Sequence, residues 1–127
     1  MTGNIIPDNA FDQLFRNART ANAWQNKAVE PALLEKIHDV MKFGPTSANC
    51  CPLRIVFVQS DAAKARLKPC LAAGNVDKSM TAPVVALFAQ DMKFYDHLPF
   101  LFPHTDARSW FAGNADAINS TATRNST

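Results

Sequence analysis

The sequence lacks any long apolar run, and this absence argues against a membrane span. Its longest uncharged apolar stretch, residues 82–89, is far shorter than the ~20 residues that cross a bilayer. The N-terminus also lacks a basic start followed by an apolar block, and its acidic residues are unlike a transit peptide. We therefore expect a cytoplasmic protein with no membrane partner.

Cysteine is scarce as well, with only Cys50, Cys51 and Cys70. Three cysteines cannot all pair within the chain, and adjacent cysteines form a strained bridge, so free thiols are predicted. Neither a C-x-x-C pair nor a spaced histidine pair is present, so we expect no metal site. One alternative is that the cysteines serve in thiol catalysis assisted by His97 and His104. The simpler alternative is that they are small packing residues at the mouth of a strand.

An excess of charge is also missing. Thirteen basic residues against eleven acidic ones give a net charge of +2, and the basic residues are scattered along the chain. A nucleic-acid-binding protein usually carries a concentrated basic stripe, so no nucleic-acid partner is expected. A small-molecule substrate, including an acidic one, remains compatible with this charge.

What the 127 residues do contain is the composition of one globular domain, 47% apolar and 19% charged. An apolar stripe, Phe11 to Ala18, predicts a helix beginning near Asp8, with Asp8 as its N-cap, followed by a loop. A second stripe, Leu33 to Met41, predicts a helix that opens at Glu30-Pro31 and ends at Gly44-Pro45.

Two apolar runs, residues 53–60 and 83–90, predict strands that are covered on both faces. Between them we expect a helix capped by Asp61, bent near Pro69, and then a loop over 74–82. Two strands rarely make a stable sheet, so further sheet is expected. A final helical stripe reaches the last residues without a closing Gly, Pro or basic turn, so the chain is predicted to stop inside a helix.

Four segments together carry a family resemblance: "ARTANAW" (18–24), "MKFGPTSANCCPLRIVF" (41–57), "LAAGN" (71–75) and "LFPHTDARSWF" (101–111). From about residue 11 onward the chain resembles the N-terminal part of an FMN-dependent nitroreductase-family protein, most closely the malonic semialdehyde reductase (3-hydroxypropionate dehydrogenase) subgroup. The resemblance implies an α+β fold, a helix-flanked sheet that is incomplete at the C-terminus. Residues 1–127 would form a single partial domain, about two thirds of the family length, that acts as a homodimer with FMN at the subunit interface.

The same resemblance assigns cofactor-binding residues, although Ala18 and Asn22 stand where relatives often carry basic residues. A guanidinium fork and a hydroxyl suit phosphate oxygens, and short side chains in a turn allow a ring to approach. Arg19 as a solvated helix-end cation, and Ser47 and Asn49 as groups that only satisfy their own turn, remain alternatives. The implied flavin-binding residues are Arg19, Thr20, Asn22, Pro45, Thr46, Ser47, Asn49, Asn75 and Lys78.

Substrate binding is expected near His104 and Arg108. Arg108 could hold a substrate carboxylate, or Asp106 could pair with Arg108 and cap the short helix that carries Trp110. No catalytic triad or carboxylate pair is visible, so no catalytic side chain is assigned.

The resemblance implies that reduced FMN, itself reduced by NAD(P)H, passes hydride to malonic semialdehyde or to a nitro or quinone acceptor. A truncated, catalytically silent fragment that acts only through a partner is the alternative.

Overall fold

The computed structural model describes residues 5–126. Helical segments outnumber strands, and many of them are short 3-10 turns or, in η1, a π-helical turn. The elements in chain order are α1 (Asp8–Phe11), η1 (Asp12–Arg16), α2 (Pro31–Met41), η2 (Ser47–Asn49), β1 (Leu53–Val58), α3 (Asp61–Leu67), η3 (Lys68–Cys70), η4 (Ala73–Asn75), α4 (Val76–Thr81), β2 (Val85–Gln90), η5 (Phe94–His97), α5 (Leu98–Leu101), η6 (Ala107–Trp110) and α6 (Ala115–Arg124).

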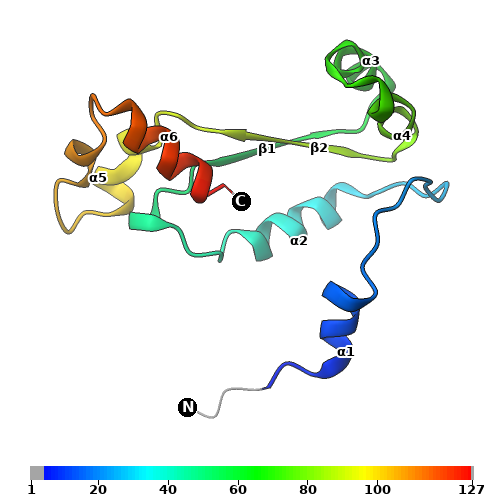
Figure 1. Ribbon diagram of the computed structural model, residues 1–127, viewed down its shortest axis with the longest axis horizontal. Helices are drawn as coiled ribbons and strands as arrows, with labels where there is room; N and C mark the ends of the chain where they lie inside the picture. Colours follow the sequence, from blue (N-terminus) through cyan, green and yellow to red (C-terminus); the bar gives the residue numbers. More distant parts are fainter. Residues whose placement is uncertain (1–4, 127) are drawn as a thin grey trace.

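The sheet is a ribbon of two antiparallel strands, in register from Leu53 opposite Gln90 to Val58 opposite Val85. Figure 1 shows this ribbon joining two helical groups, α3 and α4 at one end and α5 and α6 at the other, while α1 lies apart from both. Both strands form where they were predicted. Their predicted burial on both faces is wrong, since Val56 and Phe88 are 55% and 65% exposed.

The core lies at the α5 and α6 end of the ribbon. Phe94 and Leu98 are fully buried, and the Phe94 and Phe111 rings meet nearly edge-on at 4.9 Å between centroids. Ala122 of α6 is also fully buried against this cluster. The expectation that the chain stops inside a helix is wrong, because α6 closes at Arg124, a basic last-turn residue, with Asn125 as its C-cap.

The middle helices depart from the sequence prediction in two places. Ser60, and not Asp61, is the N-cap of α3, since its Oγ accepts a hydrogen bond from Ala63 N at 3.2 Å. Residues predicted as a loop form η4 and α4 instead. A tertiary contact lies at the end of this helix: the buried Lys64 Nζ donates to the carbonyl of Ala82, the C-cap of α4, at 2.5 Å. The predicted disturbance of the last turn by Pro69 is observed as a change of helix type, since α3 ends at Leu67 and the 3-10 turn η3 contains Pro69.

The two N-terminal helices form where expected. Glu30 occupies the N-cap position of α2 without a side-chain capping hydrogen bond, and α1 begins at Asp8, with Pro7 and not Asp8 at its N-cap. Their apolar stripes are largely uncovered, with Leu34 the buried residue of α2. Within residues 5–126, no helix combines the length and apolarity that a bilayer crossing requires.

Candidate functional site

The turn between α2 and β1 holds four of the predicted flavin-binding residues, Pro45, Thr46, Ser47 and Asn49, and we call residues 45–51 the polar turn. It is fixed by one hydrogen bond within the turn and by two hydrogen bonds with distant residues. Thr46 Oγ1 accepts from Cys51 N at 3.3 Å, and Asn49 Nδ2 donates to the Leu101 carbonyl at 3.1 Å. The Ser47 N–H donates to Asn125 Oδ1 at 2.7 Å. The C-terminal helices thus hold the polar turn in place.

The backbone of the polar turn is unusual for residues other than glycine. Ala48, Asn49 and Cys51 have φ of 50°, 53° and 38°, in the left-handed region. Asparagine tolerates this region, whereas alanine and cysteine rarely adopt it. Such a conformation persists where the surroundings fix it, and such sites are often functional.

The neighbouring cysteines differ in environment. Cys50 is 1% exposed and belongs to the core, whereas Cys51 is exposed, with its Sγ 3.5 Å from Thr46 Oγ1. Burial, and secondarily the adjacent Cys51, raises the pKa of the Cys50 thiol. Cys50 is therefore a protonated packing residue at neutral pH. All three cysteines are free, as predicted.

A second group of predicted residues lies on the loop after η1 and on α4. Trp24 Nε1 donates to the Lys78 carbonyl at 2.8 Å, so the loop containing Arg19, Thr20 and Asn22 is tethered to the segment containing Asn75 and Lys78. Lys78 is half-buried and the other four are exposed. The Arg19 guanidinium donates to the carbonyls of Arg16 and Ala18, at 2.9 and 2.7 Å, within its own loop.

These two groups do not meet within one chain. The polar turn precedes β1, and α4 precedes β2, so the antiparallel ribbon places them at opposite ends (Figure 1). A strand of this length spans roughly 17 to 20 Å. One chain therefore presents two separate sets of predicted cofactor contacts.

The predicted substrate residues lie near the polar-turn end. Arg108 donates to Asp96 Oδ1 through Nε, at 3.0 Å, and its guanidinium lies 5.8 Å from the centre of the Tyr95 ring. Asp106 caps η6 through Ser109 N at 3.3 Å, as one alternative predicted, although Arg108 pairs with Asp96 and not with Asp106. The exposed His104 packs edge-on against Phe102, with 5.2 Å between ring centroids.

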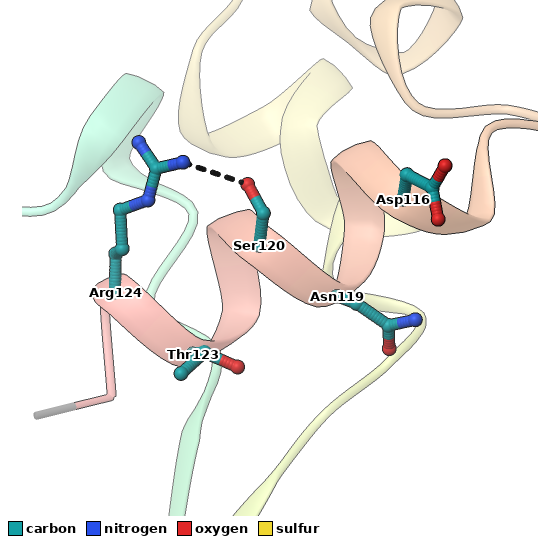
Figure 2. Close-up of a pocket in the computed structure, with 5 residues that line it drawn as sticks. All are labelled: Asp116, Asn119, Ser120, Thr123 and Arg124. Carbon is teal, nitrogen blue, oxygen red and sulfur yellow. Dashed lines mark hydrogen bonds between the residues drawn. The ribbon is translucent and has the colours of Figure 1, made fainter.

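A shallow depression lies along the exposed face of α6 (Figure 2). Arg124 Nη2 donates to Ser120 Oγ across it at 3.1 Å. Its lining residues, Asp116, Asn119, Ser120, Thr123 and Arg124, include none of the predicted site residues. Across the described part of the chain, no three histidine, cysteine or acidic side chains gather as a metal site requires.

The chain is similar to known proteins both in sequence and in fold. A Burkholderia lata protein, named as an inferred NADH dehydrogenase/NAD(P)H nitroreductase, is 60% identical over 121 residues, which cover 95% of this chain and 62% of that protein. A similarly named Stenotrophomonas maltophilia protein is 52% identical over 116 residues, 91% of this chain and 59% of that protein. No protein-family model matches.

Among solved structures, an inferred nitroreductase from Exiguobacterium sibiricum, crystallised with FMN, matches with a TM-score of 0.78. The match covers 91% of this chain and 63% of that chain, at 23% identity. The chain is therefore similar, over more than nine tenths of its length, to proteins named as nitroreductases. The predicted α+β, nitroreductase-like fold is confirmed. The chain spans less than two thirds of the length of these relatives.

Some residues that hold the candidate site in place were not predicted from the sequence. Trp24 lies inside the "ARTANAW" segment. Its indole N–H was a sequence signal of a tertiary contact, because a tryptophan in a polar loop needs a hydrogen-bond partner. Asn125 and the Leu101 carbonyl gave no such signal, because they lie 78 and 52 positions from the residues they contact.

Proposed function

We propose that this chain is a member of the nitroreductase family and forms the flavin-holding part of an FMN-dependent NAD(P)H oxidoreductase. The observation that carries the proposal is the fold shared with the FMN-bound Exiguobacterium sibiricum protein over 91% of this chain. The names of the Burkholderia and Stenotrophomonas relatives support NAD(P)H as electron donor and nitro compounds as acceptors.

The chemistry of the side chains fits this cofactor. Lys78, Arg19, Thr20 and Asn75 offer cationic and hydrogen-bonding donors for a phosphate, on two segments joined by the Trp24 hydrogen bond. The polar turn offers short side chains beside which a planar ring can lie. FMN, when bound, supplies the hydride transfer, so the protein needs to provide position and hydrogen bonds and no nucleophile of its own.

A homodimer is part of the proposal. The two sets of cofactor contacts lie at opposite ends of the ribbon, so two antiparallel copies would bring the polar turn of one chain toward the Lys78 group of the other. A reducing, cytoplasmic location is compatible with the three free cysteines.

Malonic semialdehyde is proposed as one acceptor, beside nitro and quinone compounds. Arg108 is the candidate for the substrate carboxylate, and its present partner Asp96 is an exposed carboxylate that a substrate could replace. Arg108→Ala should then raise KM for the aldehyde acid more than KM for an uncharged quinone. Equal changes for both acceptors would remove Arg108 from this role.

The first test is visible spectroscopy of the purified chain, alone and with added FMN, followed by an NAD(P)H oxidation assay with each acceptor class. Bound flavin with an oxidised-flavin band that bleaches on adding NAD(P)H supports the proposal. A colourless chain that neither binds FMN nor oxidises NAD(P)H contradicts it and favours the silent fragment.

A further inference from the structure

Among the contacts of the described residues, Asn125 is the one side chain at the end of α6 that forms a hydrogen bond with the polar turn. Its Oδ1 accepts the Ser47 N–H at 2.7 Å, and its Nδ2 donates to the Thr121 carbonyl at 2.8 Å. Asn125 is half-buried and is the C-cap of α6. Its amide is therefore anchored on its own helix while it binds a residue 78 positions away.

The polar turn needs an external contact at this position. Ser47 begins η2, and the first N–H groups of a helical turn have no partner within it. The next residues, Ala48 and Asn49, are left-handed, and neither is glycine. A contact that fixes the N–H just before these residues limits the conformations that the turn can adopt.

We propose that Asn125 is a positioning residue for the flavin-binding turn, acting through the Ser47 amide and not by contact with the flavin. This inference rests on the proposed function as far as the flavin is concerned. The hydrogen bond from Asn49 to the Leu101 carbonyl holds the other side of the turn. The C-terminal helices thereby set the geometry in which Ser47 and Asn49 meet the cofactor.

The test compares Asn125→Ala with Asn125→Asp, which keeps an oxygen acceptor for Ser47. Asn119→Ala is the matched control, because Asn119 lies on the exposed face of the same helix, in the depression of Figure 2. Asn125→Gln moves the amide by one methylene and carries the test if Asn125→Ala does not fold. Two readouts are used: hydrogen exchange at the Ser47 amide, and FMN affinity with the visible circular dichroism of the bound flavin.

We expect Asn125→Ala to speed Ser47 exchange and weaken FMN binding, each by roughly threefold to tenfold, the equivalent of one hydrogen bond. The flavin dichroism should change with it, while Asn119→Ala stays near the parent protein. Asn125→Asp keeps the acceptor for Ser47 but loses the Nδ2 donor to the Thr121 carbonyl, so it should fall between Asn125→Ala and the parent. Unchanged exchange at Ser47 would overturn the inference, as would faster exchange with unaltered FMN affinity and dichroism. If the parent protein binds no FMN, the proposed function fails, and Ser47 exchange still decides whether Asn125 holds the turn.

Discussion

At the scale of single residues, the two cationic side chains proposed to bind the flavin phosphate are held differently. Arg19 bonds to carbonyls of its own exposed loop, whereas Lys78 is half-buried on α4 beside the Trp24 contact. A phosphate must draw Arg19 away from these carbonyls, so part of its binding free energy is offset. Lys78 meets no such competition in the contacts described.

Arg19→Ala and Lys78→Ala should each weaken FMN binding by about 1.5 to 3 kcal/mol, the range for a lost hydrogen bond to a charged group. Because of its competing carbonyls, Arg19 should show the smaller loss. Flavin fluorescence titration measures both, and Lys36→Ala, on the exposed part of α2, is the control. Superimposable titration curves for both variants and the parent would disprove the phosphate assignment.

Cys50 should be inert to alkylation and should make the fold sensitive to alkali. Because burial raises its pKa in the folded state, the unfolded chain loses the thiol proton first as pH rises. Stability should be intact below the ordinary thiol pKa of about 8.5 and should fall above it toward the folded-state value. Urea unfolding at pH 7 to 10 measures this, and Cys50→Ala should reduce the slope while the exposed Cys70→Ala leaves it unchanged.

The sequence allowed Ser47 and Asn49 to be named as candidate site residues, but it did not reveal the residues that they contact. Side-chain chemistry is local information, whereas the contacts with Leu101 and Asn125 depend on how distant helices pack. The left-handed Ala48 and Cys51 were equally out of reach, because neither residue type favours that backbone region.

At the scale of elements, α3 depends on its cap. Ser60→Ala should lower the free energy of unfolding by about 1 kcal/mol, because the Ala63 N–H loses its acceptor. Thermal denaturation measures the loss. Ser60→Asp keeps an acceptor and should stay near the parent protein. An equal loss in Asp61→Ala would show that the cap is misassigned.

The helices and strands were predicted correctly where the sequence signal was local. Proline and glutamate at the start of α2 and Gly44 after it specified that helix, and β-branched runs specified both strands. The α4 helix was not predicted, and the contact of Lys64 with its C-cap, across 18 positions, is one that the local sequence does not reveal. Strand burial was misjudged because an apolar run does not reveal what covers it.

At the scale of the whole molecule, the chain exposes far more surface than a compact protein of its mass. Its accessible surface is 9874 Å². A folded monomer of 13.9 kDa is expected to expose roughly 6,700 Å². The excess of about 3,200 Å² per chain is larger than the roughly 1,000 to 2,500 Å² that each partner of an obligate dimer buries. It includes apolar side chains of α2 such as Val40, 75% exposed, together with the nearby Phe43, 81% exposed.

The chain should therefore self-associate at micromolar concentration. Sedimentation velocity over a concentration series should show a mass above 13.9 kDa. Val40→Lys with Phe43→Lys should weaken the association if α2 takes part, while Lys36→Ala should not. A monomer at every concentration that unfolds in one cooperative transition would contradict this and would weaken the homodimer proposal.

The register of the ribbon also has a consequence for the order of folding. Val58 and Val85 pair across 27 positions, and Leu53 and Gln90 across 37. Each pairing requires the intervening chain to close first, and this closure becomes slower as the separation grows. The α3 and α4 segment shortens that path when it forms, since Lys64 and Ala82 join residues only 18 positions apart. Strand pairing should then begin beside these helices at Val58 and proceed toward the polar turn, so the polar turn would be among the last parts of the chain to take its final shape.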